Sequence, residues 1–201
     1  MNDLSISHGL NSWAARHDGV EDPISAYASA SEALFLLLLF VLFAVVWGRM
    51  RTLARRAAVA AGASAGIALA IGQVLSHVVD RPRPFVAHPG LIHLFAPHVA
   101  DPGFPSDHTT AAFAIATAIV LRNRLWGGLA LAAATLLGLS RVVIGVHYPL
   151  DVLAGAALGS AVALALFLPP ARRVTDRVAD VLGAAFDAMT RRAGALVGLR
   201  G

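Results

Sequence analysis

The chain has 201 residues, of which 57% are hydrophobic and only 14% are charged, a composition typical of membrane proteins and outside the range of water-soluble domains. All 16 basic residues are arginines and no cysteine is present, which excludes disulfides, thiolate metal sites and thiol nucleophiles. Because the arginines are not gathered into a stripe, we expect no nucleic acid partner. Neither a linker nor an internal repeat divides the sequence, so residues 1–201 are predicted to form one membrane-embedded domain.

The first predicted element is an acidic segment, residues 1–30, that contains no membrane span. Its apolar side chains recur at helical spacing and indicate a short interfacial helix, and a loosely ordered arm is the alternative. Five apolar runs follow, which we compare with the roughly 20 residues needed to cross a bilayer. They cover residues 31–48, 57–79, 106–121, 126–146 and 150–168. The third run is short by that standard and is expected to rely on its flanks.

The last predicted element begins at residue 171, where apolar side chains recur at helical spacing among arginines and aspartates. This pattern predicts an amphipathic helix that anchors residues 171–201 to the membrane surface. The order of elements predicts an all-α polytopic membrane helix bundle, with about five transmembrane helices and an interfacial helix at each end of the chain.

The arginines indicate which side of the membrane each connecting segment faces. They cluster between the first two runs, between the third and fourth, and after the fifth, as Arg49, Arg51, Arg55, Arg56, Arg122, Arg124, Arg172, Arg173 and Arg177. By the positive-inside rule these segments are cytoplasmic. Five spans then place the N-terminal segment outside the cytoplasm, where acidic residues outnumber the single Arg16.

The unusual polar residues lie near the ends of the predicted spans. "DRPRPF" (80–85) closes the second span, "PSDH" (105–108) opens the third, "SRVVIGVH" (140–147) closes the fourth and "YPLD" (148–151) opens the fifth. Because alternate ends of successive antiparallel helices lie on the same side, we expect these segments to meet at the extracytoplasmic face. Ionisable groups at such positions are costly and mark functional sites.

The residue types in this cluster suit a phosphate group. The guanidinium groups of Arg83 and Arg141, with Arg81 as a further candidate, match phosphate oxygens and stay charged. Pro105 and Ser106 indicate a helix start, whose free N–H groups attract an anion. The cluster is therefore predicted to bind a phosphate.

An imidazole and a carboxylate in the same cluster suit phosphoryl transfer. Asp151 falls in the first turn of the fifth span and can accept a hydrogen bond from one nitrogen of His147, which leaves the other nitrogen free to attack phosphorus. His108 is then placed to protonate the departing oxygen and later to activate water. We predict as catalytic residues His147, His108 and Asp151, and as substrate-binding residues Arg83, Ser106, Arg141 and Arg81.

These motifs, in this order, resemble the three-part signature of the type-two phosphatidate phosphatase superfamily, whose membrane members dephosphorylate lipid phosphates and pyrophosphates. The signature reads Arg-Pro, Pro-Ser-x-His and Ser-Arg-x5-His-x3-Asp, and this chain has Arg83-Pro84, Pro105-Ser106-Asp107-His108, and Ser140-Arg141 with His147 and Asp151. Within the superfamily, "PSDH" and the N-terminal layout most resemble the bacitracin-resistance type of undecaprenyl-pyrophosphate phosphatase. The resemblance covers roughly residues 70–155.

The resemblance implies a role for each matching residue. It implies a phosphohistidine formed on His147, with Asp151 orienting the ring and His108 acting as general acid and then as general base. It also implies that the phosphate oxygens are held by Arg83, Ser106 and Arg141. Neither a metal nor another cofactor is needed in that mechanism.

One position departs from the signature. The superfamily has a lysine seven residues before the arginine of the first motif, whereas this chain has Ser76 there, with His77 beside it. We hypothesise that Arg81 or His77 supplies the missing charge. Weaker phosphate binding or a reduced activity are the alternatives.

Several other residues have plainer explanations. His88, His93 and His98 are spaced by five in a proline-containing loop, a spacing that matches no standard metal-ligand pattern, so we expect them to be solvated or interfacial. His77 is expected to be a polar residue that faces the bundle. The Gly and Ala residues of 57–72 and 153–165 predict close helix packing and leave a homo-oligomer open.

The sequence therefore predicts a phosphatase that converts undecaprenyl pyrophosphate to undecaprenyl phosphate and inorganic phosphate at the outer face of a bacterial cytoplasmic membrane, with the polyprenyl substrate and membrane lipids as its partners. Phosphatidylglycerol phosphate, phosphatidate and a lipid A phosphate are alternative substrates. A membrane protein that binds lipid phosphate without cleaving it is a further alternative, which the absent lysine favours. An intramembrane serine hydrolase is a weaker one, because Ser106 lacks the Gly-x-Ser-x-Gly elbow.

Overall fold

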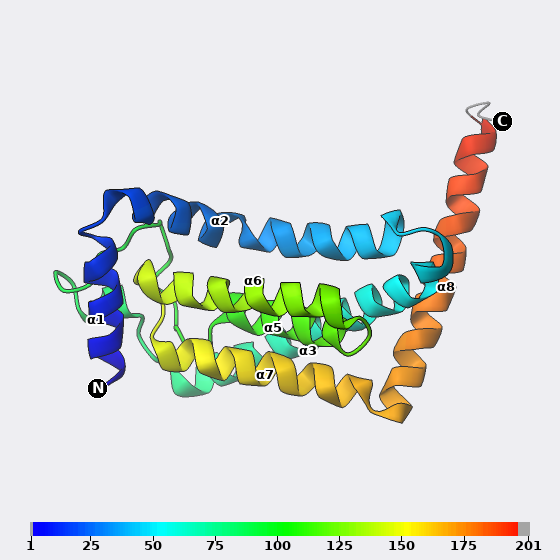
Figure 1. Ribbon diagram of the computed structural model, residues 1–201. Coiled ribbons are helices and arrows are strands. Elements are labelled where there is room, and N and C mark those ends of the chain that lie inside the picture. Colours follow the sequence, from blue (N-terminus) through cyan, green and yellow to red (C-terminus); the bar gives the residue numbers. More distant parts are fainter. Residues whose placement is uncertain (1, 197–201) are drawn as a thin grey trace.

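A computed structural model describes residues 2–196 of the chain (Figure 1). Most of this part of the chain is helical and none of it forms a strand, which confirms the all-α prediction. The elements are α1 (Asp3–Ala14), α2 (Asp18–Phe40), the π-helical turn η1 (Val41–Val45), the 3-10 turn η2 (Gly48–Met50), α3 (Arg51–Val79), α4 (Pro84–Ala87), α5 (Asp107–Val120), α6 (Arg124–Val143), α7 (Pro149–Phe167) and α8 (Pro169–Leu196). Residues 197–201 of the predicted tail lie outside the described residues.

Within residues 2–196, four segments are long and apolar enough to cross a membrane, and they contain α2, α3, α6 and α7. The third of the five predicted spans, residues 106–121, corresponds to the 14-residue helix α5, which is too short to qualify by itself. Helix α5 runs alongside α3, α6 and α7 (Figure 1), and most of its side chains are buried. Because protein encloses α5, it does not need the length of a lipid-facing helix.

The close packing of α7 on α5 depends on glycine. A Cβ atom on Gly159 would lie 2.2 Å from the carbonyl oxygen of Thr110, and one on Gly155 would lie 2.7 Å from that of Ser106. The small residues of 153–165 therefore allow the backbones to approach, as predicted. In α3, by contrast, alanines form most of the buried face.

The N-terminal segment is mostly helical, and α1 lies across one end of the bundle (Figure 1), so the alternative of a loosely ordered arm is wrong. The buried face of α1 consists of Ser7, Asn11 and Ala14. The apolar run expected at residues 31–48 belongs to the longer helix α2, which begins at Asp18. Sequence reasoning missed this early start because the first turns of α2 are polar and contain Pro23.

Helix α8 crosses the opposite end of the bundle (Figure 1) and is held there by several ion pairs, one of which involves Arg55. The buried Arg55 of α3 donates to Asp187 at 2.7 Å and to the carbonyl oxygen of Gly183 at 3.1 Å. Phe186 packs against Phe43, whereas the other apolar side chains of the predicted anchoring face are exposed, namely Val174, Val178, Val181 and Leu182. An exposed apolar face is what a membrane-surface anchor requires.

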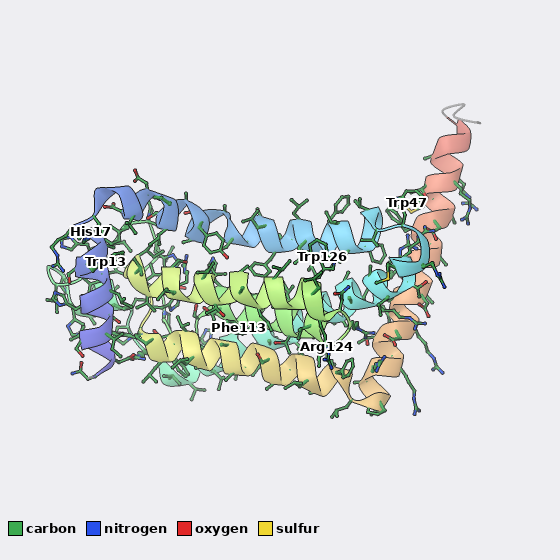
Figure 2. All side chains as sticks on the ribbon, viewed as in Figure 1. Trp13, His17, Trp47, Phe113, Arg124 and Trp126 are labelled. Carbon is green, nitrogen blue, oxygen red and sulfur yellow. The ribbon has the colours of Figure 1, made fainter. Side chains whose placement is uncertain are left out.

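Tryptophan side chains mark both ends of the bundle. Figure 2 shows Trp13 at the end covered by α1, and Trp47 and Trp126 at the end crossed by α8. All three rings are exposed, as expected for tryptophan in the headgroup region of a membrane. The two ends therefore correspond to the two membrane interfaces, and the long helices run between them.

Candidate active site

The four polar segments that were predicted to meet do converge, at the end of the bundle covered by α1. They are the segment after α3, the start of α5, the end of α6 and the start of α7. Their polar side chains are almost completely buried: the exposed fraction is 5% for Arg83, 0% for Ser106, 4% for Arg141, 2% for His147 and 0% for Asp151. Burying so many polar groups is costly, which marks the cluster as a functional site.

His147 lies between α6 and α7, and both of its ring nitrogens have partners. Nδ1 is 2.8 Å from the carbonyl oxygen of Gly103, and because a carbonyl oxygen only accepts, Nδ1 carries the hydrogen. Nε2 is 3.0 Å from Nη1 of Arg83, which only donates, so Nε2 holds a lone pair. Burial, followed by the charges of Arg83 and Arg141, lowers the pKa of His147 well below its ordinary value. The result is a neutral imidazole in the form that nucleophilic attack needs.

Several acceptors fix the guanidinium group of Arg83. Its Nε donates to the carbonyl oxygen of Asp101 at 3.1 Å and to Oδ1 of the same residue at 2.9 Å, and its Nη1 donates to the carbonyl oxygen of Val146 at 3.2 Å. Burial raises the pKa of Asp101, but the hydrogen bond and charge of Arg83 outweigh this effect and leave that pKa below its ordinary value. Arg83 is thus a fixed cation beside Nε2 of His147.

Arg141 lies in the same cluster with an incomplete set of partners. Its Nε and Nη2 are buried and have no hydrogen-bond acceptor among the described residues. A buried guanidinium without acceptors is strongly unfavourable, and phosphate oxygens supply acceptors in a bidentate geometry. The site is therefore suited to a phosphate group held by Arg141 and Arg83 beside His147.

Ser106 and His108 lie at the start of α5. The backbone N–H of Ser106 donates to the carbonyl oxygen of Asp151 at 3.0 Å, and its Oγ lies 3.0 Å from Oγ1 of Thr109. His108 is half-buried and interacts electrostatically with Arg141. It also lines a groove of about 420 Å³ between α2, α3 and α5. His108 therefore stands where the polar site meets the groove.

Residues 57–174, more than half of the chain, match the PAP2 superfamily. The chain belongs to the PAP2 superfamily. It is 39% identical over 146 residues to undecaprenyl-diphosphatase BcrC of Bacillus subtilis (strain 168), a match that covers 73% of this chain and 71% of that relative. The crystal structure of Aquifex aeolicus LpxE is similar with a TM-score of 0.61 and 25% sequence identity, over 81% of this chain and 92% of that one. A PAP2 type phosphatidylglycerolphosphate phosphatase from Bacillus subtilis shares the fold, with a TM-score of 0.58 and 21% identity, over 82% of each chain.

The family expected from the motifs is thereby confirmed, and the protein is a multi-pass membrane lipid phosphatase of the PAP2 type. In this PAP2 site, Asp151 does not make the predicted hydrogen bond to His147. Its Oδ2 is 3.7 Å from Nδ1 of that ring and accepts instead from the backbone N–H of Tyr148 at 2.8 Å. The start of α7 is the reason, because Pro149 at its first position places the Asp151 carboxylate over the free N–H of Tyr148. The carbonyl of Gly103 is the group that orients the ring, and Asp151 is placed to act on it electrostatically.

Arg81, predicted as a phosphate ligand, is engaged by two carboxylates in the PAP2 site. Its Nη1 donates to Oδ1 of Asp151 at 2.7 Å and its Nη2 donates to Oδ2 of Asp3 at 2.5 Å. Its guanidinium group also lies over the ring of Tyr148, 4.0 Å from the centroid. His77 is exposed, so the expectation that it faces the bundle is wrong. In this arrangement neither Arg81 nor His77 presents a free charge to the phosphate site.

His98, which was expected to be a solvated or interfacial loop residue, lies beside the PAP2 site and is half-buried. The centroid of its ring lies 6.5 Å from that of His147. Burial, followed by the charges of Arg83 and Arg141, lowers the pKa of His98 to about 4. The sequence did offer one signal for this position, because His98 lies in the loop that joins two of the motifs predicted to meet, residues 80–85 and 105–108. Within residues 2–196, the loop histidines form no group that could hold a metal ion.

Proposed function

We propose that the protein hydrolyses undecaprenyl pyrophosphate to undecaprenyl phosphate and inorganic phosphate through a phosphohistidine intermediate. The observation that carries the proposal is that Arg141 and His147 lie in one cluster. Arg141 has a buried guanidinium group that lacks acceptors within the described chain, and His147 is neutral with a lone pair on Nε2. The first group needs an anion and the second an electrophile, and a phosphoryl group is both. The similarity to undecaprenyl-diphosphatase BcrC favours a polyprenyl pyrophosphate as the substrate.

In the first step, Arg83, Arg141 and Ser106 bind the terminal phosphate. Nη1 of Arg83 donates to Nε2 of His147 in the free site. A phosphate oxygen replaces Nε2 as the acceptor of this hydrogen bond, which frees the lone pair of Nε2. Nε2 attacks the terminal phosphorus, and the bond between that phosphorus and the bridging oxygen breaks. The negative charge of the pyrophosphate favours the protonated form of His108, which gives its proton to the bridging oxygen as undecaprenyl phosphate departs.

In the second step, the phosphorylated ring is hydrolysed. The ring carries a positive charge, and its Nδ1–H donates to the carbonyl oxygen of Gly103, with the Asp151 carboxylate 3.7 Å away. His108, now neutral, takes a proton from water as the water oxygen attacks phosphorus. The bond between Nε2 of His147 and phosphorus breaks and inorganic phosphate leaves. His108 is again protonated and His147 neutral, so the site has returned to its starting state.

The groove beside His108 provides a place for the prenyl chain. Its walls come mainly from α2, α3 and α5, and their apolar side chains include Phe35, Leu36, Leu39, Leu69 and Ile115. Because His108 borders both this groove and the phosphate site, a substrate with its pyrophosphate among the arginines has its first isoprene units beside an apolar wall. This supports a lipid-anchored phosphate over a water-soluble one.

We place the active site at the extracytoplasmic face of a bacterial cytoplasmic membrane. The arginines at the opposite end of the bundle support this orientation, because the positive-inside rule makes that end cytoplasmic; among them are Arg51, Arg55, Arg56 and Arg122, which pair with aspartates of α8. In this orientation the enzyme recycles the lipid carrier of cell-wall synthesis at the extracytoplasmic face.

The test is phosphate release from undecaprenyl pyrophosphate by the detergent-purified full chain, with EDTA present. We expect the wild type to release phosphate and His147→Ala to release none, since the nucleophile is gone. The matched control is His17→Ala, because His17 is an exposed histidine at the same end of the bundle (Figure 2), and its rate should equal that of the wild type. Quenching the wild type in alkali during turnover should trap labelled phosphate on a histidine.

The same assay ranks the alternative substrates. Phosphatidylglycerol phosphate, phosphatidate and a lipid A phosphate are presented in the same detergent, and a higher kcat/KM on any of them would overturn undecaprenyl pyrophosphate as the preferred lipid. Release that persists in His147→Ala would overturn the phosphohistidine mechanism. No release by the wild type from any of the four lipids would point to a protein that binds lipid phosphate without cleaving it.

A further inference from the structure

Helix α1 is connected to the active site by the carboxylate of Asp3, a residue that belongs to no motif. Oδ2 of Asp3 accepts from Nη2 of Arg81 at 2.5 Å, and Oδ1 accepts from the backbone N–H of Leu150 at 3.1 Å. The exposed fraction is 15% for the Asp3 side chain and 26% for that of Arg81, so this ion pair is partly shielded from water. One carboxylate thus holds both an arginine of the site and the first turn of α7.

A continuous series of charged groups leads from Asp3 to the nucleophile. Arg81 bridges the carboxylates of Asp3 and Asp151, with its guanidinium group resting on the ring of Tyr148. Asp151 is fully buried and its Oδ2 lies 3.7 Å from Nδ1 of His147. Because Leu150 is the neighbour of Asp151 in α7, Asp3 restrains this turn through its backbone as well as through Arg81.

A second side chain fixes α1 itself in place. Asn11 is fully buried, and its Nδ2 donates to the carbonyl oxygens of His93 and Val143, at 2.8 Å each, while its Oδ1 accepts from the backbone N–H of His93 at 2.8 Å. The loop that carries His98 and Gly103 is thereby joined to the end of α6 through α1. With two such attachments, α1 cannot shift without moving the start of α7 or this loop.

We propose that Asp3 is a positioning residue of the active site, and that α1 braces the start of α7 so that His147 keeps its aim at the phosphate. In this role Arg81 acts through Asp151 and does not bind the substrate. The proposal rests on the phosphatase function proposed above for the same site. It predicts that the loss of Asp3 slows the chemical step and leaves substrate binding intact, because no hydrogen bond joins Arg83 or Arg141 to the described residues of α1.

The experiment compares four variants of the purified full chain in the phosphate-release assay. Asp3→Asn removes the charge and keeps the shape, and we expect kcat to fall about tenfold with KM within about twofold of wild type, as for a small misplacement of a reacting group. Asp3→Glu keeps the charge and should restore most of kcat. The kcat of Arg81→Gln should fall as much as that of Asp3→Asn. The variant that carries both substitutions should have no lower kcat than either single variant, because both residues act through one connection. Asp22→Asn, an exposed carboxylate on α2, is the control and should match the wild type.

Hydrogen exchange of the peptide that covers residues 147–152 gives a readout independent of turnover. Asp3→Ala should speed the exchange of the Leu150 amide, which donates to Oδ1 of Asp3, and the corresponding alanine variant of Asp22 should not. An unchanged kcat in Asp3→Asn beside an active wild type would overturn the proposal, as would unchanged exchange in Asp3→Ala. A rise in KM alone would overturn it in favour of direct substrate binding by Arg81. A wild type that cleaves no lipid phosphate would overturn the proposed function, and the exchange result would still decide whether α1 braces α7.

Discussion

Replacing Arg141 with methionine should strongly slow phosphate release and at the same time make the protein more stable. Nε and Nη2 of Arg141 are buried and lack acceptors among the described residues. An unsatisfied buried polar group costs about 1–3 kcal/mol, and more if it is charged. Methionine has a similar length and needs no hydrogen bond, so Arg141→Met should gain about 1–3 kcal/mol of stability. For a chain of this size, each kcal/mol corresponds to roughly 2–4 °C in Tm.

The assay is thermal unfolding of the detergent-solubilised protein in phosphate-free buffer, run beside the phosphate-release assay. Arg141→Met should melt at a higher temperature than the wild type and release phosphate at least about a hundredfold more slowly, because one of the groups that stabilise the transferring phosphoryl is gone. Adding inorganic phosphate should raise the Tm of the wild type and leave that of the variant unchanged. The control is Arg124→Met, since Arg124 is an exposed arginine at the other end of α6 (Figure 2).

Two results would refute this reasoning. A lower Tm in Arg141→Met would show that the guanidinium group makes stabilising contacts in the free protein. Full activity in the variant would show that Arg141 does not bind the phosphate. The wild-type response to inorganic phosphate separates these cases, because it reports on the anion site without requiring turnover.

Three further predictions concern stability and the groove. The pKa of His98 is about 4 in the folded protein against an ordinary 6.5, so between these pH values the unfolded chain binds a proton that the folded protein does not. The stability of the protein should therefore fall as the pH drops from 6.5 to about 4. In Tm measurements over this range, His98→Ala should show a smaller fall than the wild type. In Gly159→Ala the new Cβ would lie 2.2 Å from the carbonyl oxygen of Thr110, and we expect a loss of about 1–3 kcal/mol in thermal unfolding. The control Gly66→Ala, with nothing within 4 Å of its Cβ position, should be neutral or stabilising. In Gly62→Phe a ring would project into the groove from α3, and KM for undecaprenyl pyrophosphate should rise by about tenfold. A short-chain prenyl pyrophosphate should be much less affected, and an equal rise for both substrates would show that the tail does not lie there.

The convergence of the motifs was predictable from the sequence because it depends only on the order of antiparallel helices. Each motif stands at the end of an apolar run, and the runs fix which ends share a side. The length of α5 was a weaker prediction, because hydropathy measures how apolar a segment is and not whether protein or lipid surrounds it. Gly155 and Gly159, which bring the backbone of α7 against α5, show that this helix is enclosed.

The partners of His147 were beyond sequence reasoning for two physical reasons. The acceptor of its Nδ1 hydrogen is the backbone carbonyl of Gly103, and since every residue has a carbonyl, no side-chain pattern identifies the one that binds. Asp3 reaches Arg81 and Leu150 across 78 and 147 positions of the chain, a separation over which one sequence carries no pairing signal. The carboxylate that the sequence did identify, Asp151, is near His147 but is committed to capping α7.

The arrangement of charge around His147 shows why this displaced carboxylate still matters in the proposed mechanism. Nδ1 of the ring faces the carbonyl of Gly103 and the carboxylate of Asp151, whereas Nε2 faces the guanidinium group of Arg83. Attack on phosphorus turns the neutral ring into a cation while a negatively charged phosphoryl group joins Nε2. Negative groups beside Nδ1 and positive groups beside Nε2 therefore interact more strongly with the transition state than with the resting site, which is the condition for catalysis.

Asp3 makes the Nδ1 side of the His147 ring more negative, because it pairs with Arg81 on the side away from Asp151. A lone arginine paired with Asp151 would cancel most of the negative charge that Asp151 presents to Nδ1. Because Arg81 is shared between two carboxylates, the group of Asp3, Arg81 and Asp151 carries a formal net charge of −1, from two carboxylates and one guanidinium. This negative charge stabilises the neutral ring of the resting His147 only slightly, and it stabilises the positively charged phosphorylated ring more. Asp3 is thus expected to act on kcat both by holding the start of α7 and by keeping the Nδ1 side of the ring negative.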